Sequence, residues 1–155
     1  MSPSVYDRIR DPAAVRAARA GATTSGFGAL RGHKYCLLVS YRRSGEPVPT
    51  PVWFGIDARE HVFVSTESGS WKVKRVRANP RVLLGPANGR GKPLGALAEG
   101  TARVLPPGEH AAAERVVQAN YGLGRRVYER LFGARVSDVA YLEVTPANPD
   151  AEVPS

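Results

Sequence analysis

The stretch Pro47-Val48-Pro49-Thr50-Pro51-Val52-Trp53-Phe54 places a proline at every second residue of a predicted strand. Alternate residues of a strand share an edge, and proline has no amide N–H, so these prolines all remove hydrogen-bond donors from one edge. The amides of Val48, Thr50 and Val52 point the other way and can still join a ladder. We therefore predict a strand that is paired on one side and open on the other, where the open edge can accommodate a flat ring system beside Thr50 and Trp53. The alternative is a simple edge strand whose prolines discourage aggregation.

Strand and turn signals continue on both sides of this stretch. A run of strand formers from Lys34 to Ser40 precedes it, and the turn Arg42-Arg43-Ser44-Gly45 joins the two runs as a β-hairpin. Residues 94–105 alternate apolar or small residues with polar ones near their C-terminal end, which indicates a long half-buried strand. The remaining strands are predicted at His61–Thr66, Arg81–Ala87, Leu94–Leu105 and Val136–Thr145.

Helices are predicted in three places. Residues 11–20 form a short helix with Asp11 as the N-cap and Pro12 at the first helical position, and residues 21–28 follow as a linker or an ordered loop over the core. A second helix, Trp71–Asn79, ends at Pro80. The third begins near Pro106 and ends near Asn120, and another helix after it carries one apolar face made of Val127, Tyr128, Leu131 and Phe132.

Six short strands without a regular alternation of strand and helix predict an antiparallel barrel or sandwich, in the β-rich α+β class. The chain of 155 residues is the size of one domain. Its longest apolar runs are a few residues long, which excludes a membrane span. Residues 1–10 contain no apolar signal stretch, so we expect a cytoplasmic protein. The single cysteine, Cys36, excludes an intrachain disulfide and a thiolate metal cluster, and it is predicted to be an inert core residue.

Positive charge is concentrated in one segment. The net charge is +8, and the segment between Ser68 and Ala98 has no acidic residue. Its bases are Lys72, Lys74, Arg75, Arg77, Arg81, Arg90 and Lys92. Such a concentration suits a polyanionic ligand, namely a nucleic acid, a membrane surface or a phosphorylated cofactor. The alternative is a solvated helix face, although such a face normally mixes charges of both signs.

The loop Ser65–Ser70 leads into the basic helix and predicts an anion site. Amides at a helix start, together with small hydroxyl groups, hold phosphate oxygens, and Lys72, Lys74 and Arg75 would add charge. The loop lacks the Gly-Lys-Ser pattern of a Walker loop, and no Gly-x-Gly-x-x-Gly opens a helix after a strand. The three histidines are far apart in the sequence, so neither a metal site nor a catalytic triad is expected. If the protein is an enzyme, a bound cofactor carries the chemistry.

The order and spacing of several short motifs resemble those of the split β-barrel flavin and deazaflavin reductases, the pyridoxamine 5'-phosphate oxidase-like and coenzyme F420-dependent oxidoreductases. The motifs are Thr50-Pro51-Val52-Trp53-Phe54, Ser65-Thr66, Lys72-Val73-Lys74-Arg75, Asn79-Pro80-Arg81-Val82 and Glu99-Gly100-Thr101-Ala102-Arg103-Val104. The resemblance implies a six-stranded split barrel over residues 30–146, preceded by a helix and loop at 1–29 and followed by a tail at 147–155. It also implies a homodimer with the cofactor at the subunit interface.

The resemblance also implies roles for individual residues. The flavin or deazaflavin ring would be lined by Thr50, Pro51, Val52 and Trp53. The ribityl chain or phosphate would contact Ser65 and Thr66, and the phosphate would bind Lys72 and Lys74, with Arg75 nearby. The family's lysine is often followed three residues later by asparagine, and this chain has Arg75 there.

Three functions follow as hypotheses. The first is an oxidoreductase in which F420 transfers hydride to an electron-poor small-molecule substrate, with FMN as the alternative cofactor. The bases of the helix favour F420 because its phosphate and oligoglutamate tail is longer and more anionic than FMN. The second is a non-catalytic barrel that binds a cofactor, haem or lipid. The third, a nucleic-acid-binding module, fits the pI of about 10.1 but lacks a recognised binding motif.

Overall fold

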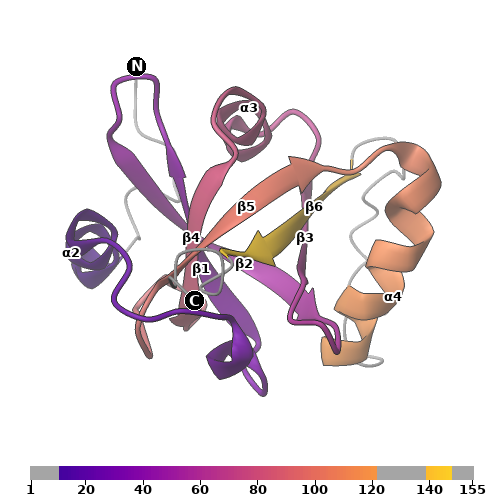
Figure 1. Cartoon of the computed structure of the whole chain (residues 1–155), viewed down its shortest axis with the longest axis horizontal. Coiled ribbons are helices and arrows are strands. Elements are labelled where there is room, and N and C mark those ends of the chain that lie inside the picture. The colour runs from indigo at the N-terminus through magenta and orange to yellow at the C-terminus, as the bar shows by residue number, and fades with distance from the viewer. Residues whose placement is uncertain (1–10, 122–138, 148–155) are drawn as a thin grey trace, which may run out of the picture.

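The computed structural model describes residues 11–121 and 139–147. Six antiparallel strands close into a barrel in the order β1-β2-β3-β6-β5-β4 (Figure 1). The strands are β1 Tyr35–Tyr41, β2 Pro47–Ile56, β3 Val62–Glu67, β4 Arg81–Ala87, β5 Ala98–Val104 and β6 Val139–Pro146. The predicted β-rich α+β class and the six-stranded antiparallel barrel are therefore confirmed.

The described helices cover three sides of the barrel. They are α2 Pro12–Ala20, α3 Trp71–Ala78 and α4 His110–Tyr121, with 3-10 turns η1 Gly28–Leu30 and η2 Pro107–Glu109. In Figure 1, α2 and α4 lie on opposite sides of the barrel and α3 lies above it. None of the helices within the described part of the chain is long and apolar enough to cross a membrane. The helix predicted around Val127–Phe132 lies outside the described residues.

Local signals explain where the helices begin. The Asp11 carboxylate accepts a hydrogen bond from Ala13 N at 2.8 Å, so Asp11 is the N-cap of α2 as predicted. The Ser70 hydroxyl accepts a longer one from Val73 N at 3.5 Å and caps α3. Asn79 and Pro80 follow α3 and end it, because proline cannot supply the amide that another helical turn needs.

The strands alternate between an interior face and an exterior face, and both are buried over much of their length. The interior cluster consists of Phe27, Leu30, Cys36, Leu38, Val52, Phe54, Val62, Val64, Val76, Val82, Leu84, Ala98, Ala102, Leu142 and Val144. Cys36 is fully buried in it, which confirms the core assignment, and burial raises the pKa of its thiol. On the exterior, α2 covers Leu37, Val39 and Leu83, and α4 covers Phe63 and Tyr141.

Residues 21–28 form an ordered loop over the core, which decides between the two predicted alternatives. Thr23 N and Thr24 N both donate to the carbonyl of Leu97, and Phe27 N donates to the Glu60 carboxylate at 2.9 Å. The ring of Phe27 is buried against Gly100, where a Cβ would come within 2.6 Å of it. The loop therefore places an aromatic side chain in the barrel interior.

The prediction of one long strand over Leu94–Leu105 is wrong in its first half, because β5 begins at Ala98. Leu94 N donates to the carbonyl of Pro86 at 2.8 Å, and a Cβ on Gly95 would lie 2.8 Å from the Pro86 ring. This segment thus folds back over the end of β4 and carries the buried Leu97 to the cluster beneath α2. Its small residues permit that close approach. Their alternate spacing is also typical of a strand, which explains the wrong prediction. The start of β6 was predicted at Val136, and residues 136–138 lie outside the described part.

Candidate functional site

Among the described residues, strand β2 has a different neighbour along each of its two parts, and only Trp53 pairs on both sides. It pairs with β1 from Pro47 to Trp53, but with β3 only from Trp53 to Ile56. The carbonyl of Glu46 accepts from Arg42 N on the β1 side, and backbone groups two residues apart share an edge. The backbone groups of Val48, Thr50 and Val52 therefore point to β1. This confirms the prediction of a strand that is paired on one side and open on the other.

The open side of residues 47–52, called the β2 edge below, has an unusual composition. Its residues are Pro47, Pro49 and Pro51, whose carbonyl oxygens point away from β1. Because proline has no N–H, this edge presents hydrogen-bond acceptors and no backbone donor. It is thus suited to a ligand that donates hydrogen bonds and is poorly suited to another β-strand.

The four predicted ring-lining residues differ in how far they face this edge. Thr50 and Pro51 are half-buried beside it. Val52 lies in the barrel core, and its backbone points to β1. Trp53 is half-buried on the exterior face, where its ring lies 5.4 Å from the ring of Tyr121, at an angle of 35°. Thr50, Pro51 and Trp53 are therefore the members of this group whose side chains reach a surface next to the edge.

The end of α4 holds the β1–β2 ladder where it stops. Phe54 N donates to the Tyr121 hydroxyl at 2.9 Å, and that hydroxyl donates to the carbonyl of Lys34. The Asn120 side chain donates to the carbonyls of His33 at 2.9 Å and Phe54 at 3.0 Å. Tyr121 thus fixes the backbone next to Trp53 and packs on the Trp53 ring. Nothing in the sequence pattern singled out Tyr121, since its partners are remote in sequence.

Ser65 and Thr66 mark the point where β3 separates from β2. Ser65 pairs with Trp53, and this is the last residue pair of the two strands before they part. Thr66 and Glu67 continue along β6 alone. Because strand residues alternate, Thr66 shares the face of the core residue Val64, whereas Ser65 shares the face of Phe63. The two hydroxyls therefore lie on opposite faces at one site.

Arg75 connects α3 to the hairpin. Its Nε donates to the hydroxyl of Ser40 at 2.7 Å, and Ser40 is fully buried. Ser40 pairs with Val48, so this contact lies at the proline-rich half of β2. A buried hydroxyl requires a partner, which explains why a serine is tolerated in the apolar run of β1. The sequence placed Arg75 in the site but not Ser40 beneath it.

Lys72 occupies an environment that disfavours its own charge. Lys72 is half-buried, and desolvation of its ammonium lowers the pKa of Lys72. The nearby guanidinium of Arg75 lowers it further. The Glu67 carboxylate opposes the shift. Two neighbouring cations repel each other, and a bound anion offsets this repulsion and favours the charged form of both. Lys72 and Arg75 are therefore a candidate anion site, called the α3 anion site below, close to Glu67 at the end of β3.

Lys74 faces another direction from Lys72. The two residues are two positions apart on a helix, which separates them by about 200° around its axis. The Lys74 ammonium lies 4.4 Å from the centre of the Trp71 ring, and Trp71 is 61% exposed. The structure thus brings Lys72 and Arg75 together and places Lys74 apart, next to an aromatic side chain that the sequence analysis did not assign.

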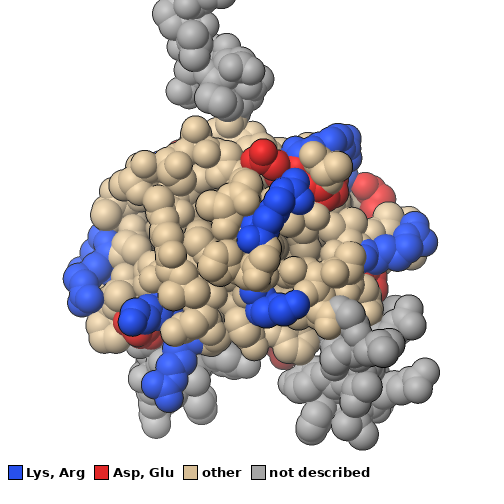
Figure 2. Space-filling model, turned by 90° about the horizontal axis from the view of Figure 1, so that it is seen from below, with Lys and Arg blue, Asp and Glu red and all other residues tan. Residues whose placement is uncertain are grey.

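The other bases of the segment do not share one face. Arg81 donates to Glu99 at 2.8 Å, and its guanidinium lies over the Tyr41 ring. Figure 2 shows the face opposite α3, where the basic side chains lie apart from one another and some lie beside acidic ones. A continuous basic surface of the kind that tracks a nucleic-acid backbone is not seen on the described part of that face.

Residues 27–148 match the sequence model of the family described as pyridoxamine 5'-phosphate oxidase. The chain belongs to this family. The resemblance noted in the sequence is thereby confirmed, and the split barrel that this family shares with flavin- and F420-binding proteins is the fold seen here. No curated protein matches the chain by sequence.

Solved structures with the same fold have different stated ligands. An F420 reductase is 17% identical, with 81% of this chain and 97% of that chain covered and a TM-score of 0.53. A FAD-binding protein from Mesorhizobium loti is 15% identical, covering 77% and 86%, with a TM-score of 0.55. HutZ, a haem storage protein from Vibrio cholerae, is 15% identical, covering 76% and 84%, with a TM-score of 0.53. Identities this low show a shared fold and leave the ligand of this member to its own residues.

Proposed function

We propose that this member of the pyridoxamine 5'-phosphate oxidase family is an oxidoreductase that uses coenzyme F420 to transfer hydride to an electron-poor small-molecule substrate. The observation that carries the proposal is the position of the α3 anion site next to the β2 edge. Arg75 bonds to Ser40, whose strand partner Val48 lies between the first two prolines of that edge. One ligand with a phosphate and a flat ring bearing N–H donors fits both features.

The residues of the chain divide the binding task. Lys72 and Arg75 would hold the phosphate, because their charges are mutually unfavourable until an anion is bound. The carbonyls of the β2 edge would accept hydrogen bonds from the ring, and Thr50 and Trp53 would flank it. Bound F420 would supply the hydride, and the protein would supply orientation and electrostatics.

A homodimer is part of the same proposal. The β2 edge is open on the side away from β1, so a ligand lying along it would keep one side uncovered by this chain. A second copy packed over the edge would cover that side and exclude water from the ring. Donor-free edges do not form a continuous β-ladder with each other, so the contact between copies would be made by side chains.

FMN and haem are the competing ligands. FMN has a ring of similar shape to that of F420 and a phosphate, but its anionic part is shorter. It would therefore use the same α3 anion site and β2 edge with fewer cations. A haem-binding barrel is supported by the similarity to HutZ. It would be a carrier and would show no hydride transfer.

The experiment is a titration of the purified protein with F420, FMN and haem, followed by fluorescence and absorbance, with Lys72→Ala and Lys74→Ala as a matched pair. A charge-assisted hydrogen bond is worth about 1.5–3 kcal/mol, so Lys72→Ala should weaken F420 binding by about one to two decades. Lys74→Ala removes the same charge from the opposite side of α3 and should change the affinity little. Equal F420 affinities for wild type and both variants, or tight binding of haem alone, would overturn the proposal.

A further inference from the structure

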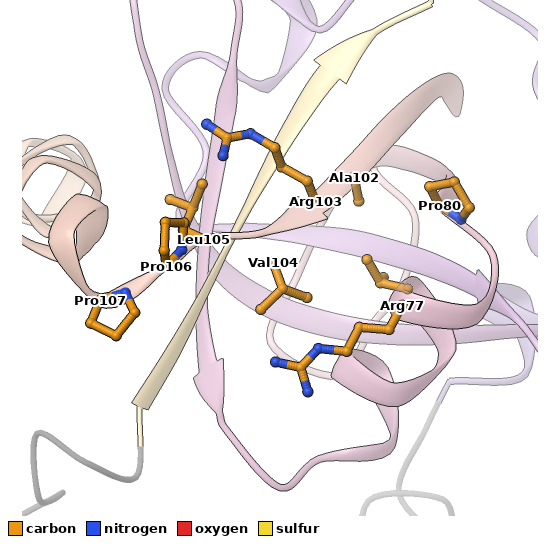
Figure 3. A pocket seen from close by; sticks show the side chains of 9 residues that line it. Arg77, Pro80, Ala102, Arg103, Val104, Leu105, Pro106 and Pro107 are labelled. Carbon is orange, nitrogen blue, oxygen red and sulfur yellow. The ribbon is translucent and has the colours of Figure 1, made fainter.

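A groove of about 480 Å³ lies on the other side of α3 from the α3 anion site. It is lined by Val76, Arg77, Pro80, Ala102, Arg103, Val104, Leu105, Pro106 and Pro107, and it is called the β5 groove below. In Figure 3 the Val104 side chain lies between Arg77 of α3 and Arg103 of β5. The volume of the β5 groove is within the range of small-molecule sites, which combine an apolar lining with a few polar groups.

The groove exists because β4 is offset along β5 and begins only beside the middle of that strand. β4 begins at Arg81, which pairs with Thr101, so the last three residues of β5 have no strand beside them on that side. Ala102 N still donates to the carbonyl of Pro80 at 2.8 Å. Beyond this bond the chain of Pro80 turns away into α3, and a short stretch of β5 edge is left open.

The open stretch presents an amide donor. Leu105 N donates to the carbonyl of Tyr141 on the β6 side, and backbone groups of a strand alternate between its two edges. The N–H and C=O of Val104 therefore point to the groove. Neither group has a hydrogen-bond partner within the part of the chain that the structure describes. An unpaired amide beside apolar side chains is a site for an acceptor.

Arg77 supplies a cation at the same place. It lies four positions after Val73 and next to Val76 on α3, so its stem runs beside the buried stripe that packs on β5. Among residues 11–121 and 139–147, no carboxylate pairs with it. The guanidinium of Arg103 is different, because it is bonded to Glu143 at 2.8 Å and to Glu109 at 2.8 Å. The groove therefore has one cation whose charge is not matched.

We propose that the β5 groove binds a small carboxylate with an apolar body. The carboxylate would bridge the Arg77 guanidinium and the Val104 N–H. The apolar body would lie against Val76, Leu105 and the three prolines, which offer no competing amide donors. The charge of Arg77 and the donor at Val104 select an anion over a neutral or cationic ligand of the same size. This site is separate from the α3 anion site and does not depend on the proposed cofactor.

The test is a titration of the isotopically labelled full chain with octanoate, followed residue by residue by amide NMR. Octanol and octylamine are titrated in parallel, because they carry the same apolar body without the negative charge. We expect a saturable shift of the Val104 amide with octanoate. An exposed ion pair is worth at most about 1 kcal/mol, so octanoate should bind about fivefold more tightly than octanol. Octylamine should bind most weakly.

Variants separate the two polar contacts. Arg77→Gln should reduce octanoate affinity to that of octanol, whereas Arg43→Gln removes an exposed arginine of the β1–β2 turn and should change nothing. Val104→Pro removes the amide donor and should also weaken octanoate binding. If the Val104→Pro variant does not fold, the Arg77→Gln variant is sufficient to test the proposal. The proposal is overturned by the absence of a saturable shift at Val104, by equal affinities for octanoate and octylamine, or by unchanged octanoate affinity in folded Arg77→Gln. Each of these results leaves F420 binding untouched.

Discussion

The β2 edge and the open stretch of β5, both in the described part of the barrel, differ in the groups that they present. The β2 edge carries prolines at alternate positions and offers carbonyl acceptors alone. The open stretch of β5 keeps the N–H of Val104. The β2 edge arises where β3 separates from β2, and the open stretch of β5 arises where β4 has not yet begun beside it. The first edge suits a ligand that donates hydrogen bonds, and the second suits one that accepts them. The placement of proline thus sets the ligand chemistry of an edge, in addition to protecting it from aggregation.

Helix α3 lies between the two edges and directs different cations to each. Lys72 and Arg75 share the face near β3 and the hairpin, and Arg77 lies at the β5 groove. Lys74 comes one helical turn before Arg77, but its ammonium lies over the Trp71 ring and it does not line the groove. A run of bases that is uniform in sequence is therefore divided by the helical period into separate sites.

The largest expected effect is on ligand affinity when the arginine at each edge is replaced in turn. Arg75→Ala should weaken F420 binding by about one to two decades, because it removes a charge-assisted hydrogen bond donor from the α3 anion site. Arg77→Ala should leave F420 affinity unchanged and weaken octanoate binding. Titrations of both variants with both ligands check this. Parallel losses in the two variants would mean that α3 acts as one undivided basic surface.

The next effect is on the free energy of unfolding and concerns the end of the β1–β2 ladder. There Tyr121 pairs backbone groups, whereas the proline half of β2 leaves its outer carbonyls open. Tyr121→Phe keeps the ring against Trp53 and removes the hydroxyl that joins Phe54 N to the carbonyl of Lys34. Leaving such groups unpaired costs about 1–3 kcal/mol, which urea unfolding should show. Tyr41→Phe, at a half-exposed tyrosine on β1, is the control. Equal stability of the two variants would mean that water replaces the Tyr121 hydroxyl.

A smaller effect is expected from a substitution that makes the β2 edge resemble the open stretch of β5. Pro49→Ala restores an N–H on the β2 edge, so that edge can then donate to a strand of another molecule. One added hydrogen bond is worth about 1 kcal/mol, and self-association should strengthen about fivefold in sedimentation experiments. Pro107→Ala, at an exposed position outside the strands, should have no such effect. If the Pro49 variant associates no more than wild type, the β2 edge is already covered.

The smallest effect is a pH dependence at the α3 anion site. Burial and Arg75 lower the pKa of Lys72, and a bound anion raises it again, so the affinity is highest while Lys72 is protonated. FMN affinity should fall about threefold as the pH rises through the lowered pKa, because solvent still reaches the half-buried side chain and its ion pair is worth less than about 1 kcal/mol. Lys72→Arg should abolish this fall, since arginine stays protonated. An identical fall in Lys72→Arg would assign the titration to another group.

The strands that decide the barrel were predictable because their signals are local. The hairpin around the β1–β2 turn, the alternate prolines and the N-cap Asp11 each depend on residues a few positions apart. The same kind of local pattern was misleading at Leu94–Leu97, where small residues reflect packing over Pro86 and not a strand. Alternation in sequence does not distinguish a strand from a segment held against another element.

The sequence by itself determined the class of fold, the donor-free composition of the β2 edge and the concentration of bases on α3. Tertiary structure decided which of those bases act together, because Arg75 meets Ser40 across 35 residues and Tyr121 meets Phe54 across 67. It also decided that β4 ends before β5 and leaves the β5 groove open. Hydrogen bonds and charges act over a few ångströms in space, whereas sequence patterns report neighbours along the chain. Contacts between remote segments therefore appear only once the barrel is closed.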